Sequence, residues 1–457
     1  MIELLYLFAA LCGTLIIGNI LARLIGNPKV HFAFDLSVLA ALAIVIAYML
    51  YVGTNQTVAS TVAINGFSLF FMLIATVGLA LVSMIAYCQK TAFWDFAVMS
   101  SFSLMGAYIV ASSVSIITIF IGLELMGIAS VFVVIMSRKS LEASTKFFIA
   151  ASLSVAMLAI ASVLMYGSTG SLAISPYAGK GLLALSAVIF IAAIGVEASI
   201  FPFNILIPDI YDGSPAYATA MLGGINKKIG FAALLQVLFV VFVRFDSLHM
   251  LIAVLAAATM LYGNLAAIMQ TRLKRMLAYS SIAQAGYIMI GIAVATPAGL
   301  TASLVQIFAH VFLFIGIFAI VAWLESRDRV EIDDVIGLNK ESRLAAFGMT
   351  LFMLSMAGLP FTTGFIGKLL LFTSAIGGGM VWLAIVGIVN SIISIYYYAR
   401  PIIAAYTAKD NAVRMKLKLP LKAAIIACIG ITIIFGVYPQ PLITLASHAG
   451  AVLTGLA

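Results

Sequence analysis

Charged residues are scarce in this chain of 457 residues. They make up 9% of it, whereas soluble domains carry about 25%. Hydrophobic residues account for 64%, a composition that excludes a soluble domain and indicates an integral membrane protein. Cysteine is scarce too, and Cys12, Cys88 and Cys428 form no CxxC pair. We therefore expect no iron–sulfur cluster and no zinc site held by this chain alone.

Signals for redox cofactors and nucleotides are also missing. The four histidines, His31, His249, His310 and His448, are dispersed, and no pair has haem-ligating spacing within one helix. The chain has no glycine-rich loop of the common nucleotide-binding types. We therefore expect no cofactor on this chain. The net charge of +8 follows a membrane topology, so we expect lipids as partners and no nucleic acid.

Long apolar runs dominate what is present. A helix needs about 20 apolar residues to cross the hydrocarbon core of a bilayer. Fourteen runs qualify, and their continuity favours helices over barrel strands. They are 3–22, 32–52, 64–87, 94–112, 114–136, 144–166, 181–203, 215–243, 248–270, 276–295, 300–324, 344–375, 380–404 and 421–446. The sequence thus predicts an all-α polytopic membrane protein with about 14 transmembrane helices.

The basic residues predict the orientation of these helices. Of the 24 lysines and arginines, 18 lie at loops on the side opposite the termini, and four lie within apolar runs. The other side holds only Lys180 and Arg244. Because basic loops stay in the cytoplasm, we expect both termini on the extracytoplasmic side. The first run lacks the basic start of a signal peptide, so we interpret it as the first span.

Seven charged residues stand inside or near the ends of the apolar runs. A charge at the bilayer centre costs from about 2.5 to 10 or more kcal/mol, and such residues usually serve a function. Loss of water disfavours a charged lysine and a neighbouring carboxylate favours it, so lysines beside glutamates can exchange protons. We therefore expect a proton path along Glu124, Glu197, Lys227, Lys228 and Lys368, with Glu142 and Lys146 as possible relays.

Two spans carry a proline inside the apolar run, each near a charge. Pro202 follows Glu197 in the seventh span, and Pro360 precedes Lys368 in the twelfth. Proline breaks a helix and frees backbone carbonyls, and a matched pair of broken helices indicates internal repeats around an ion path. We expect inverted repeats of spans 4–8 and 9–13. The predicted domains are an N-terminal three-helix segment (1–93), a first repeat (94–243), a second repeat (244–406) and a C-terminal loop and helix (407–457).

Several segments resemble the antiporter-like subunits of complex I. They are Glu124 to Phe148, Phe201 to Pro215, Arg275 to Tyr287 and, most specifically, Met356-Ala-Gly-Leu-Pro-Phe-Thr-Thr-Gly-Phe-Ile-Gly-Lys368. Within that family the chain is similar to the N-type subunit. It stops soon after the last span, and His310 to Phe314 lacks the lysine that the L- and M-types carry there.

The resemblance implies a non-redox, proton-translocating subunit of a complex I-like enzyme in the cytoplasmic membrane of a prokaryote. Glu124, Lys227 and Lys368 match the family's central residues, and Glu142 and Lys146 match a pair on the sixth helix. Other subunits of the complex are expected to hold flavin, iron–sulfur clusters and a site for a quinone or related carrier. The implied partners are M-type and small K-type subunits. The alternative is a component of a multisubunit sodium/proton antiporter or a membrane-bound hydrogenase.

The chain departs from the family pattern in its first half. Glu197 replaces the usual lysine of span 7, Asn204 replaces a histidine, and the lysine of span 8 is doubled as Lys227-Lys228. Protons then either move along a path in which acidic and basic groups alternate in a different order, or Glu197 blocks the path by a static ion pair with one of the two lysines. Pairing that merely fixes helix packing is the alternative for all the lysines.

Two further residues have two readings each. His310 is either a relay beyond Lys368 or a core histidine, and its ordinary titration range suits a relay. Asp209 is either a point of proton uptake or a cap for the start of span 8, where a carboxylate is favoured.

Overall fold

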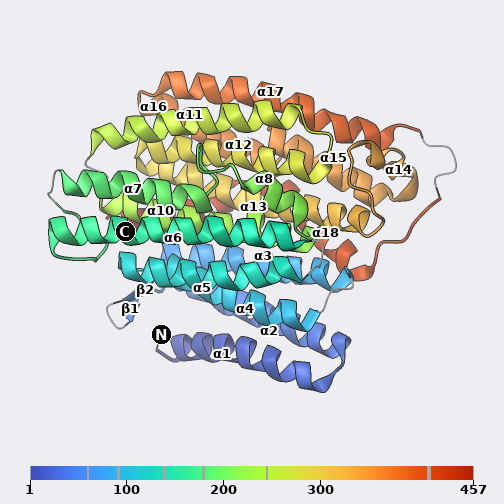
Figure 1. The fold of residues 1–457 in the computed structure, drawn as a ribbon, viewed down its shortest axis with the longest axis horizontal. Coiled ribbons are helices and arrows are strands. Elements are labelled where there is room, and N and C mark those ends of the chain that lie inside the picture. Colours follow the sequence, from blue (N-terminus) through green and yellow to red (C-terminus); the bar gives the residue numbers. More distant parts are fainter. Residues whose placement is uncertain are drawn as a thin grey trace.

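Long helices that run side by side make up nearly all of this computed structural model (Figure 1). The structure describes residues 2–58, 61–89, 93–136, 140–177, 181–242, 245–408 and 413–455. Several basic residues used for the predicted orientation lie outside the described residues: Lys90, Arg138, Lys139, Lys180, Arg244 and Lys409.

Among its described residues, the first half of the chain contains ten α-helices, a short hairpin and one π-helical turn. The helices are α1 (Ile2–Ile25), α2 (Pro28–Tyr51), α3 (Gly66–Cys88), α4 (Phe93–Ala111), α5 (Ile116–Ile135), α6 (Leu141–Thr169), α7 (Leu182–Glu197), α8 (Ile207–Gly213), α9 (Ala216–Met221) and α10 (Lys227–Val240). The antiparallel strands β1 (Gln56–Val58) and β2 (Val62–Ile64) lie between α2 and α3. The π-helical turn η2 (Leu222–Asn226) joins α9 to α10.

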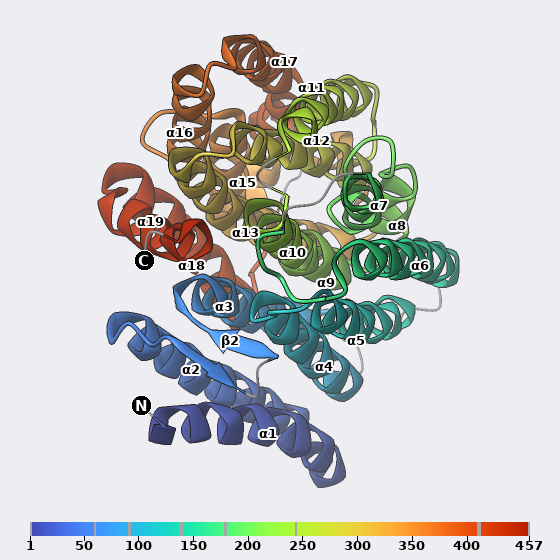
Figure 2. The same ribbon diagram turned by 90° about the vertical axis from the view of Figure 1, so that its left-hand side faces the viewer.

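The second half is also helical. It contains α11 (Asp246–Ile268), α12 (Leu273–Val294), α13 (Pro297–Glu325), α14 (Leu338–Glu341), α15 (Arg343–Ala357), α16 (Thr363–Gly377), α17 (Val381–Tyr406), α18 (Leu419–Val437) and α19 (Gln440–Thr454). A 3₁₀ turn, η3 (Asp333–Val335), precedes α14. Figure 2 looks along the bundle, with α13 in its middle and α1 at one edge.

The predicted all-α polytopic architecture is confirmed. Within the described residues, twelve helices are long and apolar enough to cross a membrane, with α9, η2 and α10 forming one of them. The helices of the broken pairs α7/α8 and α15/α16 are too short to be among these twelve, and we interpret each pair as one further crossing, which makes fourteen. Both chain ends lie toward the same end of the bundle, as an even number of crossings requires (Figure 1). The repeat and domain boundaries stay predictions.

Both predicted helix breaks are present. α7 ends at Glu197, and α8 starts only at Ile207, beyond Pro202. α15 ends at Ala357, and the C-cap residue that follows, Gly358, has a φ of 103° in the left-handed region that glycine adopts most readily. The amide of Gly358 donates to the carbonyls of Leu354 and Ser355, which closes the last turn. Each break therefore ends a helix in the interior of the apolar run.

The last predicted span is wrong in its C-terminal boundary. The run 421–446 is not one helix, because α18 ends at Val437 and α19 starts at Gln440. Pro439 and Pro441 flank the start of α19, and neither can donate the amide hydrogen bond that would continue α18. α19 packs against α3 and α13. The start of α3 touches it closely, since Gly66 faces the backbone of His448 and Ala449.

Candidate functional site

The break in span 7 brings a carboxylate and an amine to one small cavity. Glu197 is the last residue of α7, and Lys227 is the first residue of α10, directly after the π-helical turn η2. Both line a cavity of about 20 Å³, together with Tyr211 and Asn226. That volume holds about one water molecule. Single π-helical turns occur often at functional sites, because they rotate the residues that follow.

Lys227 is held by α12 rather than by a carboxylate. Its ammonium donates to the Ser281 carbonyl oxygen at 2.7 Å and to the Ser281 hydroxyl at 3.0 Å. In the described part of the chain, Glu197 lies within ion-pair distance of neither Lys227 nor Lys228. The static pair that would block the path is therefore not formed. A second carboxyl, that of Glu124 on α5, lies near enough to Glu197 to interact with it electrostatically.

Lys228 and His310 form a buried pair of basic groups between α10 and α13. Their relative exposures are 1% each. Neither the amine of Lys228 nor either ring nitrogen of His310 has a hydrogen-bond partner among the described residues. The imidazole stacks on Phe314, with ring centroids 5.4 Å apart. Its charged neighbours are Lys228 and Lys227.

The expected place of His310 is thus wrong. It was predicted beyond Lys368, but it lies beside the lysines of span 8. The reason is that α13 runs through the middle of the bundle, where α9 and η2 pack against it. His310 therefore faces the first half of the chain rather than the outer end of the second.

Lys368 binds the backbone that the second break frees. Its ammonium donates to the carbonyl of Ala357, the last residue of α15, at 3.0 Å and to the Ser391 hydroxyl at 2.6 Å. It also lies 4.4 Å from the centroid of the Tyr287 ring, a cation–π contact. Its exposure is 3%. The predicted link between a broken helix and a buried lysine is confirmed here.

Two buried glutamines that the sequence analysis missed link α13 and α12 to the end of α15. Gln306 stands one helical turn before His310 on α13, and its amide donates to Gln284 of α12 at 2.9 Å. Gln284 in turn donates to the carbonyl of Met356 at 3.1 Å. A side chain at Gly367 would collide with the carboxamide oxygen of Gln306, so Gln306 packs directly on the residue before Lys368. The sequence signal that could have identified Gln306 and Gln284 is an amide side chain within an otherwise apolar span.

Lys146 and Glu142 were expected near the membrane interior, and this is wrong. Glu142, whose side chain is 80% exposed, pairs with Lys146 at 2.7 Å. The Lys146 ammonium also contacts Asp209 at 2.9 Å, and Arg275 binds the other oxygen of Asp209 at 2.6 Å. All four groups form a solvated ionic cluster near the start of α6, because lysine's long stem lets its charge reach the surface.

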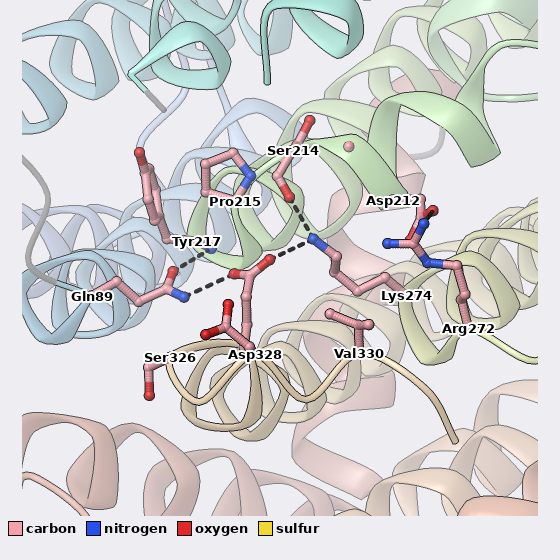
Figure 3. A pocket seen from close by; sticks show the side chains of 12 residues that line it. Gln89, Asp212, Ser214, Pro215, Tyr217, Arg272, Lys274, Ser326, Asp328 and Val330 are labelled. Carbon is pink, nitrogen blue, oxygen red and sulfur yellow. Dashed lines mark hydrogen bonds and ion pairs between the residues drawn. The ribbon is translucent and has the colours of Figure 1, made fainter. Parts of the chain in front are cut away.

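The residue that caps span 8 is Glu325, not Asp209. One oxygen of Glu325 accepts from the amide of Ala216 at the start of α9 and from the Gln89 side chain, both at 2.9 Å. Its other oxygen accepts from Lys274 at 2.5 Å, and Lys274 also donates to the Ser214 carbonyl at 2.8 Å. Figure 3 shows this network in a pocket of about 560 Å³. It joins the end of α3, the start of α12 and the end of α13 to the start of α9.

Residues 113–394 match the sequence model of a family described as "NADH:quinone oxidoreductase/Mrp antiporter, TM". This is more than half of the chain and includes both breaks and every buried lysine named above. The chain belongs to this family. The predicted resemblance to N-type antiporter-like subunits is confirmed by two relatives.

Both relatives are family members named as subunit N. F(420)H(2) dehydrogenase subunit N of Methanosarcina mazei is 34% identical over 422 residues, covering 86% of this chain and 85% of the relative. NADH-quinone oxidoreductase subunit N of Desulforamulus reducens is 40% identical over 366 residues, covering 76% of each chain.

Solved structures of the NADH:quinone oxidoreductase/Mrp antiporter type share the fold. A chain of respiratory complex I from Thermus thermophilus superposes with a TM-score of 0.84 and 25% identity, covering 96% of this chain and 99% of that one. A chain of the Mrp complex from a Dietzia species superposes with a TM-score of 0.91 and 20% identity, covering 98% of both. The second likeness concerns the fold alone.

Proposed function

We propose that this chain is a proton-translocating, non-redox membrane subunit of a complex I-like respiratory oxidoreductase. One observation carries the proposal: ionisable and amide side chains in the interior follow one another from the first broken helix to the second. They are the partly buried Glu197 and the buried Lys227, Lys228, His310, Gln306, Gln284 and Lys368, and Glu124 lies near enough to Glu197 to interact with it electrostatically.

The first transfer is between Glu197 and Lys227. Because they line one cavity without forming an ion pair, a proton can move between them through a single water. The two acceptors on Ser281 stabilise Lys227 in its charged form. Two carboxylates close together repel one another. Loss of a proton from Glu124 therefore favours a proton on Glu197, and the reverse also holds. The two carboxyls here take the place of the family's usual glutamate–lysine pair.

The doubled lysine passes the proton from the first half to the second. Two ammonium groups on adjacent residues repel one another in a medium of low dielectric constant. A proton that arrives on Lys227 therefore disfavours a charge on Lys228. Lys228 and His310 have free basic nitrogens on α10 and α13, where the two halves meet. If the lysines only fixed helix packing, Lys228 would need a partner to hold, and none is present among the described residues.

The second half continues through amides to Lys368. Gln306 and Gln284 supply donors and acceptors that orient water but do not titrate themselves. Lys368 ends this line against the Ala357 carbonyl and the Ser391 hydroxyl. The surface cluster of Asp209, Lys146, Glu142 and Arg275 remains our proposed point of proton uptake.

The relatives' names support the wider assignment. Subunits named N in an NADH-quinone oxidoreductase and an F(420)H(2) dehydrogenase are consistent with NADH or a reduced deazaflavin as electron donor. We place flavin, iron–sulfur clusters and the quinone or related carrier on other subunits. Neighbouring partners would be M-type and K-type subunits, in a prokaryotic cytoplasmic membrane with both termini of this chain outside.

The test uses the whole complex reconstituted in liposomes. Protons moved per electron are compared between the wild type and Lys368→Met, which removes the charge but keeps most of the side-chain volume. Lys422→Met, at an exposed position on α18, is the matched control. We expect fewer protons per electron only in Lys368→Met. An unchanged ratio in that variant would overturn the proposal, as would sodium-driven proton movement in the absence of any electron donor.

A further inference from the structure

A second buried ionisable group lies outside the proposed path, in the N-terminal helices. Asp35 of α2 is 1% exposed, and Asn19 of α1 and His31 of α2 are 0% exposed. Asn19 donates its amide to Asp35 at 2.9 Å and to the Ser101 hydroxyl of α4 at 2.9 Å. The oxygen of the same amide contacts Nε2 of His31 at 3.0 Å. One asparagine therefore links a carboxyl, an imidazole and a hydroxyl.

The cluster has two free hydrogen-bonding atoms. Oδ2 of Asp35 and Nδ1 of His31 are buried and have no partner among the described residues. Ser83 of α3 faces Asp35, but its hydroxyl is not hydrogen-bonded to the carboxyl either. A buried polar atom without a partner is costly, and a buried charge without a partner is more so. A bound proton removes the larger of these costs for the carboxyl, that of the buried charge.

Asp35 has no cationic partner among the residues that the structure describes. In the described chain no cationic side chain lies within ion-pair distance of it, and the only titratable neighbour bonded to the cluster is His31. Arg23 of α1 pairs with Asp95 of α4 at 3.2 Å, and both are partly exposed. On α3, the neighbouring groups are Ser83, which faces Asp35, and Tyr87, which stacks on Phe32 of α2.

His31 lies between this carboxyl and the end of the bundle. It stands in the first turn of α2, where its ring packs against Phe93 and Trp94 of α4, with centroids 5.5 Å away in both cases. His31 and Asp35 are four residues apart on one helix, so their side chains share a face. The exposed Arg23–Asp95 pair joins the same end of α1 to the start of α4.

We propose that Asp35 is a second proton-binding site of this chain, loaded through His31 from the end of the bundle where α2 begins. In the transfer an N–H bond of His31 breaks, an O–H bond forms on Asp35, and His31 then takes a proton from the surface. No electrons move. Asn19 positions both groups, because its amide donates to one and accepts from the other.

The site is separate from the path described above. α4 lies between α2 and α5 (Figure 2). Ser101 of α4 faces the cluster, whereas Ser103 bonds Ser130 of α5 at 3.2 Å, and Ser130 bonds Asn226 beside Lys227 at 2.6 Å. Positions 101 and 103 point to nearly opposite sides of a helix. Proton binding at Asp35 therefore does not depend on transport along the path.

The experiment records infrared difference spectra of the purified complex between acidic and alkaline pH. We expect a titrating C=O stretching band of a buried carboxylic acid that disappears in Asp35→Asn and persists in Glu197→Gln. Asp35→Glu should restore a band at a shifted frequency, which shows that the fold tolerates a carboxyl there. His31→Gln should keep the band but slow its exchange in D₂O.

Several results would overturn the proposal. Identical spectra of the wild type and Asp35→Asn would do so, as would the absence of a band in Asp35→Glu when that variant assembles. So would an unchanged rate of D₂O exchange in His31→Gln, or a band that shifts with sodium at constant pH. None of these depends on pumping, so failure of the site and failure of the proposed function can be told apart.

Discussion

The ion pair of Lys274 and Glu325 permits a prediction with a magnitude. The side chains are 6% and 24% exposed, and Glu325 also caps the start of α9. α9 leads through η2 directly to Lys227, so this pair holds in place the segment that carries Lys227 and Lys228. Two single variants, Lys274→Met and Glu325→Gln, and their combination probe it.

The expected costs follow from what each variant leaves behind. Glu325→Gln leaves the Lys274 ammonium nearly buried, with the Ser214 carbonyl and a neutral amide, and breaking such a pair costs about 3–5 kcal/mol. Lys274→Met leaves Glu325 with two donors and some contact with solvent, so about 2–3 kcal/mol is expected. The double variant leaves no unpaired charge. Its loss of unfolding free energy should therefore be smaller than the summed losses of the two single variants by at least about 2 kcal/mol.

The assay is the free energy of unfolding of the purified chain in mixed micelles, titrated with a denaturing detergent. The matched control is Arg23→Met, which breaks a pair whose side chains are 64% and 39% exposed and should cost no more than about 1 kcal/mol. If the double variant lost as much stability as the two single variants together, the pair would not be coupled and the reasoning would be refuted.

Three further outcomes are expected. Ser391→Ala removes one of two acceptors of Lys368, an interaction worth about 1.5–3 kcal/mol, so protons per electron should fall in liposomes; an unchanged ratio would contradict this. His310→Phe keeps an aromatic ring on Phe314, so the complex should assemble but pump more slowly, and wild-type rates of proton movement would argue against a relay. Asp209→Asn should cost less than about 1 kcal/mol of unfolding free energy, since its partners are partly exposed, and a loss above about 2 kcal/mol would show that the surface cluster is structural.

The sequence was sufficient for the membrane crossings and the breaks, because both depend on local properties. Hydrophobic length sets the number of spans, and proline marks where a helix ends. The burial of Lys227 and Lys368 also followed, since each lies deep within its apolar run. Lys146 was misplaced because it stands only a few residues after the start of α6, where run length alone does not define depth.

Contacts between distant helices were beyond the sequence analysis. Rotation of a helix about its axis is set by packing against its neighbours, not by its own hydrophobicity. The bond from Asn19 to Ser101 spans 82 positions, and that from Ala216 to Glu325 spans 109. A single Asp35 or Gln306 in an apolar run looked like an ordinary part of a span, and only packing revealed its partners.

The central claim is that one continuous line joins the two halves of the chain, with Lys228 and Lys368 in series. Protons moved per electron in the reconstituted complex test it with Lys228→Met, Lys368→Met and the double variant. Groups in series give a non-additive result. The account predicts that each single variant lowers the ratio to the same level and that the double variant lowers it no further. Losses that add, or a full ratio in Lys228→Met, would contradict it.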